Sequence, residues 1–269
     1  MVVLELGRSN ERLLAFAANL ATRMGISLTG VAACQPMAAV YDQTMILEDY
    51  VQEDRDELDT EVKAAKAEFE GALTGKGIDF SWHATVTIGS LWEYTVARAR
   101  AADIILCATG REQITVTSRR AGISDMVMHA GRPVLLVPST VAKLALDHAV
   151  VAWKDTREAR RAVADALPLL KLARKVTVIE IAGEAELNDA TLRLADLVAW
   201  LDRHRIAAVA APHLGVGDDA TQLARFMDSA DADLTVAGAY GHSRLREWAL
   251  GGVTRDLLLA PTRCALVSH

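Results

Sequence analysis

A glycine-rich segment at 238–254 has the spacing with the clearest chemical meaning. Gly238, Gly241, Gly251 and Gly252 form the pattern Gly-x2-Gly-x9-Gly-Gly, which leads into a helix expected from Val253. Glycine lets a ligand approach the backbone closely. A glycine-rich turn entering a helix also leaves free N–H groups aimed at an anion, and the helix dipole adds to the attraction. The spacing predicts a phosphate cradle; the alternative is a set of plain turn residues.

Side chains around this segment could complete a ligand site. Lys154 and Arg244 could meet a phosphate, and His242 could hydrogen-bond a phosphate or a ribose. Trp153 could stack on an adenine, although packing in the core is the usual use of a tryptophan. The sequence shows no oriented partner for a histidine base and no base for Ser243. We therefore expect binding rather than catalysis, with at most weak ATP hydrolysis.

Patterns typical of metal sites are missing from the sequence. The seven histidines and three cysteines are scattered, with no His-Glu-x-x-His or Cys-x-x-Cys spacing. The stretch Glu48–Glu61 contains eight acids and one base, Arg55. It could attract a metal or a basic partner, but a solvated helix face explains it more economically. Cys107 lies in an apolar run and is expected to be a buried thiol.

The elements that must position these residues alternate between strand and helix, in the same order twice. In the first half we expect strands at 2–6, 27–33, 80–86, 103–108 and 133–137, and helices at 10–24, 48–73, 91–101 and 123–130. In the second half we expect strands at 149–153, 176–181, 207–211, 233–237 and 264–267, and helices at 157–172, 189–204, 221–230 and 253–260.

The two halves also match residue by residue. Ser9 falls on Thr156 at an offset of 147, and Asp103 falls on Asp233 at an offset of 130. The difference of 17 residues is expected within 35–73. Alternation of strand and helix implies parallel pairing with right-handed crossovers. We predict an α/β protein of two tandem Rossmann-like, doubly wound domains, 1–140 and 147–269, each with a five-stranded, mainly parallel sheet.

Composition excludes several other classes. The chain has 269 residues, 51% hydrophobic and 24% charged, and a net charge of −6. This is enough for a buried core, and the lack of a basic excess argues against nucleic-acid and membrane-surface partners. No apolar run is long enough to span a bilayer, and the first residues lack the features of a signal peptide. Together with three distant cysteines, this predicts a cytoplasmic protein.

The glycine segment resembles the nucleotide-binding signature of the universal stress protein family, Gly-x2-Gly-x9-Gly-(Ser/Thr). The repeat, the order of elements and the ending Ala-Pro-x-Arg-Cys-Ala-Leu-Val agree, so the whole chain is similar to a tandem universal stress protein. The resemblance implies a cytoplasmic stress-response protein; some members bind ATP and others do not. Carried over, it implies a nucleotide site formed by Ala152, Trp153, Lys154, Gly238, Gly241, His242, Gly251, Gly252, Val253 and Thr254.

This chain departs from the family pattern at two places in the second half. Gly252 stands at the Ser/Thr position, with Thr254 two residues further on. The usual Asp-Gly-Ser turn after the first strand is Lys154-Asp155-Thr156. A lysine there could touch a phosphate, but it cannot accept hydrogen bonds as an aspartate does.

The first half departs further from the signature. At the offset of 130, three glycines of the signature become Ala108, Arg111 and Ala121. Arg111 places a bulky side chain where a phosphate needs bare backbone. We therefore expect the first half to have a degenerate, empty site.

Three functions are compatible with these observations. The first is a stress regulator that binds ATP or a related adenine nucleotide, with or without Mg²⁺, in the second half. The second is a stress protein that binds no nucleotide and acts as a structural or partner-binding module. The third, an enzyme for adenylation or electron transfer, has only the fold in its favour, and a fold alone does not define a function.

The apolar last strands of the two halves also predict how the protein assembles. The runs 133–137 and 264–267 would be exposed sheet edges if they were left unpaired. The family resemblance implies that such strands pair, so we expect the halves to form a pseudo-dimer. Two chains are then expected to associate as a homodimer with two-fold symmetry.

Overall fold

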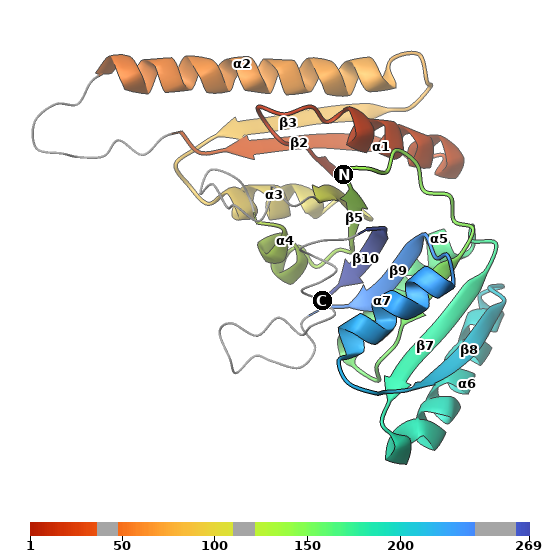
Figure 1. Ribbon diagram of the computed structural model, residues 1–269. Coiled ribbons are helices and arrows are strands. Elements are labelled where there is room, and N and C mark those ends of the chain that lie inside the picture. The colour runs from red at the N-terminus through yellow and green to blue at the C-terminus, as the bar shows by residue number, and fades with distance from the viewer. Residues whose placement is uncertain (37–47, 110–121, 240–261) are drawn as a thin grey trace, which may run out of the picture.

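The computed structural model describes residues 1–36, 48–109, 122–239 and 262–269 (Figure 1). Its strands are β1 (Val2–Val3), β2 (Leu28–Cys34), β3 (Phe80–Val86), β4 (Ile105–Thr109), β5 (Val134–Pro138), β6 (Ala149–Ala152), β7 (Val176–Ala182), β8 (Ala208–Leu214), β9 (Leu234–Gly238) and β10 (Cys264–Ser268). Its helices are α1 (Glu11–Met24), α2 (Glu48–Leu73), α3 (Leu91–Ala99), α4 (Ile123–His129), α5 (Arg157–Leu170), α6 (Leu187–Arg203), α7 (Asp219–Ser229) and the 3₁₀ turn η2 (Glu184–Glu186). The helix expected at 253–260 lies outside the described residues.

The ten strands form one continuous sheet in the order β3-β2-β1-β4-β5-β10-β9-β6-β7-β8 (Figure 1). Neighbouring strands are parallel except β5 and β10, which pair antiparallel with Leu135 opposite Leu266. The expected pairing of the two last strands is therefore confirmed. It joins the strands of both halves into a single sheet, and the division into domains 1–140 and 147–269 stays a prediction.

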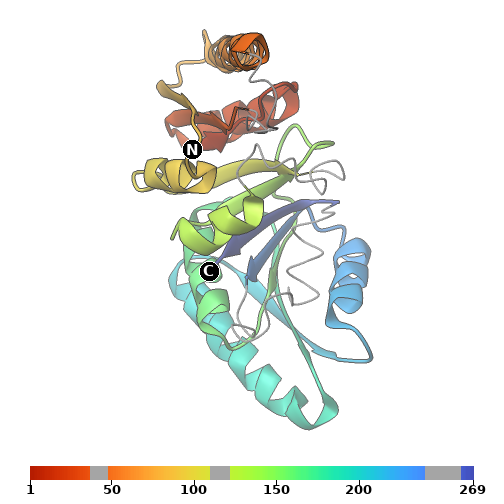
Figure 2. The same ribbon diagram turned by 90° about the vertical axis from the view of Figure 1, so that its left-hand side faces the viewer.

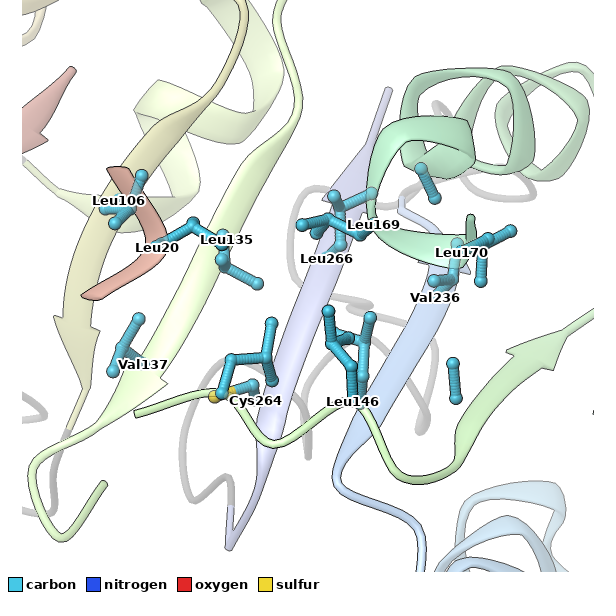
Figure 3. Close-up of a cluster of buried hydrophobic side chains, with 14 of the residues drawn as sticks. Leu20, Leu106, Leu135, Val137, Leu146, Leu169, Leu170, Val236, Cys264 and Leu266 are labelled. Atoms are coloured by element: carbon cyan, nitrogen blue, oxygen red, sulfur yellow. The ribbon is translucent and has the colours of Figure 1, made fainter. Parts of the chain in front are cut away.

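Helices cover both faces of this sheet (Figures 1 and 2). The largest apolar cluster includes side chains of α1, α2, α5 and α6, whereas α3 and α4 pack in a second cluster and α7 in a third. Figure 3 shows that the largest cluster crosses the junction of the halves, with Leu135 on β5, Leu266 on β10 and Leu169 beside Leu266. This shared core ties the two halves together at β5 and β10.

The connection from β1 to α1 corrects two expectations. The first strand, expected at 2–6, ends at Val3, because the buried Asn10 side chain binds the backbone of Glu5: Oδ1 accepts its N–H at 2.9 Å, and Nδ2 donates to its carbonyl at 2.9 Å. Asn10 also stands directly before α1, as Thr156 stands before α5, and both helices have 14 residues. Asn10, and not Ser9, therefore takes the position of Thr156.

Within the described parts of the chain, no helix combines the length and apolar character needed to cross a membrane.

Candidate functional site

The strand order reverses between β9 and β6, which lie side by side in the second half. Ligands of open parallel sheets bind beside such a reversal, at the carboxyl ends of the strands. At this edge Ala152 ends β6 and Gly238 ends β9. The other predicted cradle residues lie outside the described residues: Gly241, His242, Gly251, Gly252, Val253 and Thr254.

Gly238 is where β9 meets the first turn of α5. A Cβ added there would lie 2.5 Å from the backbone nitrogen of Ala159 and 2.6 Å from the carbonyl carbon of Glu158. No side chain fits at such distances, so a residue without Cβ is required for this strand to pack on the helix. Gly238 thus has a packing role of its own, whether or not a ligand also approaches it.

Trp153 follows β6 directly and points into the protein. It is 8% exposed and belongs to the largest apolar cluster, which is the packing role given above as the alternative to stacking on an adenine. Its indole Nε1 is buried and has no hydrogen-bond partner in the structure described. Ala152 is half-buried and packs beside the cluster under α7.

A pocket of about 390 Å³ opens at the carboxyl ends of β6, β7 and β8. Its walls come from the β6–α5 loop, the end of β7, the start of α6 and the loop between β8 and α7. The lining residues are Lys154, Asp155, Thr156, Glu180, Ile181, Ala182, Gly183, Glu186, Arg193, Gly215, Gly217 and Asp219. Of the predicted site residues, Lys154 lines this pocket, while Ala152, Trp153 and Gly238 do not.

Ion pairs neutralise most of the charge on the pocket wall. The Lys154 ammonium lies 2.9 Å from Asp219 Oδ2, and Arg160 Nη2 lies 2.5 Å from Asp155 Oδ1. The side chains of Lys154 and Asp219 are 57% and 40% exposed, so their pair is weak and easily exchanged for another partner. Lys154 is therefore held near the pocket and can still turn toward an anion.

The pair between Glu180 and Arg193 lies deeper. Only 7% of the Glu180 side chain is exposed, and its Oε1 accepts from Arg193 Nη2 at 2.5 Å and Nε at 3.1 Å. Oε2 makes one longer contact with Nε, at 3.3 Å. The hydrogen bond to Glu180 raises the pKa of Arg193. The carboxylate is thus fixed by one strong partner at the pocket wall.

Another carboxylate, that of Glu158, lies at the start of α5. Its side chain is 7% exposed and accepts hydrogen bonds from Arg157. Burial acts to raise the pKa of Glu158, but hydrogen bonds from its own backbone N–H and from Arg157 outweigh burial and lower it. The N-terminus of α5 thus already holds an internal carboxylate, which is paired with Arg157.

Sequence reasoning missed most of this pocket, including Glu180, Arg193 and Asp219. One signal was available: Glu180 interrupts the otherwise apolar run of β7, Val-Thr-Val-Ile-Glu-Ile-Ala. A charged residue in a buried parallel strand needs a partner and often marks a site. Glu180, Arg193 and Asp219 lie on β7, α6 and α7, so only the fold brings them together.

Metal and thiol chemistry find no support in the described ranges. No group of three or more His, Cys, Asp or Glu side chains there could hold a metal ion. Cys34, Cys107 and Cys264 are free and buried. Burial raises the pKa of Cys107 to about 12, which confirms the expected buried, unreactive thiol.

Neither known family models nor curated proteins match this chain by sequence. Solved structures do match its fold over almost its whole length. A universal stress protein from Archaeoglobus fulgidus DSM 4304 superimposes with a TM-score of 0.74 at 14% identity, covering 99% of this chain and 97% of that one. A functionally unknown protein from Pseudomonas aeruginosa PAO1 gives 0.58 at 15% identity, covering 99% and 91%. The chain therefore has the α/β fold of universal stress proteins.

Proposed function

We propose that this chain is a stress-response protein of the universal stress protein type that binds ATP, or a related adenine nucleotide, in its second half. One observation carries the proposal: a pocket opens over β6, β7 and β8, beside the reversal of strand order, in the half that has the glycine pattern. The nucleoside would occupy this pocket. The phosphates would rest on backbone N–H groups of Gly241, Gly251 and Gly252, which follow β9.

The charges of the pocket support this division of the ligand. Its lining has two bases, Lys154 and Arg193, against four acids, Asp155, Glu180, Glu186 and Asp219. Such a wall suits hydroxyl and amino groups better than a triphosphate. Lys154 lies on the side toward β6 and could leave its exposed pair with Asp219 for a phosphate at little cost.

The remaining features of the proposal follow from the sequence. ATP would bind with Mg²⁺ carried by its phosphates and would act as a conformational or slowly hydrolysed ligand, since no general base is evident. The two halves would be tandem domains, the first a structural partner with an empty site. The protein would work in the cytoplasm as a homodimer, without nucleic-acid or membrane partners.

A second candidate function is a stress protein that binds no nucleotide and recognises a protein partner instead. The pair between Lys154 and Asp219 favours it, because this base of the pocket lining already has an acidic partner. The internal carboxylate of Glu158 at the start of α5 favours it as well.

Calorimetric titration of nucleotide-free protein with ATP, with and without Mg²⁺, separates the two functions. We expect saturable binding of one ATP per chain, abolished by Gly241→Val, whose branched side chain would fill the cradle. Gly71→Ala on α2 is the matched control, since a Cβ there meets nothing within 4 Å, and it should bind as the parent does. No heat of binding up to millimolar ATP would favour the second function.

A further inference from the structure

The two halves have different residues at equivalent positions of their second strands, apolar in one half and charged in the other. β2 and β7 are the second strands of their halves and have seven residues each; the fifth is Ala32 in β2 and Glu180 in β7. Ala32 is buried in a closed apolar cluster with Leu58 and Ala65 of α2. At the matching place, Glu180 meets Arg193 of α6 at the wall of an open pocket.

The covering helices match in the same way. Ala65 precedes the start of β3 by 15 residues, and Arg193 precedes the start of β8 by 15 residues (80 − 65 and 208 − 193). Leu58 and Glu186 each lie seven residues earlier: Leu58 is two turns back on α2, and Glu186 ends the 3₁₀ turn η2 that precedes α6. An apolar pair in the first half is thus replaced by a glutamate and an arginine that both line the pocket.

Stability does not explain this replacement. An ion pair with a buried partner is usually no more stabilising than apolar residues of similar size, because the buried charge, here that of the 7%-exposed Glu180, loses its hydration even though Arg193 is 30% exposed. The first half shows that the same fold can close this place with alanine. Glu180 and Arg193 are therefore better explained by a ligand than by folding.

The carboxylate of Glu180 indicates which groups that ligand would have, namely hydrogen-bond donors. An ionised carboxylate accepts up to about four hydrogen bonds, and Arg193 takes mainly those of Oε1. The remaining capacity of Oε2 suits hydroxyl donors. In dinucleotide-binding Rossmann folds, an acid near the end of the second strand accepts a hydrogen bond from the 2′-hydroxyl of a ribose. β7 lies two strands from β9, about 10 Å at the usual strand spacing, so a ribose and a phosphate chain could span both ends.

We propose that Glu180, positioned by Arg193, binds the 2′- and 3′-hydroxyls of the ribose and makes the site select ribonucleotides over deoxyribonucleotides. This inference rests on the proposed function, to which it adds the specificity of the site. The first half, with Ala32 at this place, has no carboxylate there for such a contact.

The test compares ATP with 2′-deoxy-ATP by calorimetry. Loss of a hydrogen bond to a charged group weakens binding by about 10-fold or more, so the parent protein should prefer ATP by that factor. The double variant Glu180→Ala/Arg193→Ala recreates the arrangement of Ala32 and Ala65 without leaving an unpaired charge. It should fold and bind both nucleotides equally. Glu184→Gln, an exposed residue of η2 outside the pocket lining, is the control and should keep the preference.

The outcomes distinguish this inference from the proposed function. If both nucleotides bind the parent protein equally, or if the double variant keeps the preference for ATP, Glu180 does not bind the ribose and only this inference fails. If neither nucleotide binds the parent protein, the proposed function fails and this inference fails with it.

Discussion

Replacing Gly238 by alanine should destabilise the protein, because β9 packs closely on α5 at this residue. The added Cβ would lie 2.5 Å from the nitrogen of Ala159 and 2.6 Å from the carbonyl carbon of Glu158. Ordinary contacts begin at 3.4 Å, so β9 and α5 must separate by about 0.9 Å, and neither atom belongs to a flexible side chain. Overpacking of this kind costs about 1–3 kcal/mol.

Urea denaturation followed by circular dichroism measures this cost. We expect Gly238→Ala to lower the free energy of unfolding by about 1–3 kcal/mol with an unchanged slope. Gly183→Ala is the control, because a Cβ there meets nothing within 4 Å and the residue has an ordinary φ of −64°. It should leave stability unchanged or raise it by up to about 1 kcal/mol. Equal stability of the two variants would refute the close packing of β9 on α5.

Three further predictions concern buried or partly buried polar groups. Glu158→Gln should destabilise the protein at pH 7 and much less at pH 3. The lowered pKa of the Glu158 carboxyl stabilises the fold above the unfolded value of 4.5, and this stabilisation is lost as the pH falls. An equal loss of stability at both pH values would contradict the role given to Arg157. Asp233→Asn should raise the thermal midpoint at pH 7, and this gain should shrink below about pH 4. Burial raises the pKa of Asp233, so its charged form opposes folding as the pH rises. A shift in the midpoint that is constant across pH would count against this explanation. Asn10→Ala should lower the free energy of unfolding by about 1–3 kcal/mol in urea, since the N–H and carbonyl of Glu5 lose their partner; no loss would show that water replaces the side chain.

Much of the fold follows from the sequence because its signals are local. Alternating apolar strands and amphipathic helices give the order of the elements, and α2 and β3 have the expected bounds. The pairing of the last strands also follows, because uncharged, apolar runs such as Val134–Pro138 cannot remain at an exposed edge. The end of β1 could not be predicted, since it depends on a hydrogen bond from the side chain of Asn10 to the backbone of Glu5.

The candidate site was harder to predict than the fold. The glycine spacing locates a phosphate cradle along the chain, but the pocket wall is built by Glu180 on β7, Arg193 on α6 and Asp219 on α7, which are distant in sequence. Gly238 was predicted for its approach to a ligand, and the structure shows that α5 occupies the space beside it. Both the pocket wall and the space beside Gly238 depend on contacts between elements that are distant in sequence, and a local sequence pattern does not contain such contacts.

Hydrogen exchange of the full chain, with and without saturating ATP, tests most directly the claim that a nucleotide binds in the second half. The account predicts slower exchange in peptides covering 152–160, 180–187 and 238–254, with no change in the β1–α1 connection at 4–10. Unchanged exchange throughout, or protection confined to the first half, would contradict it.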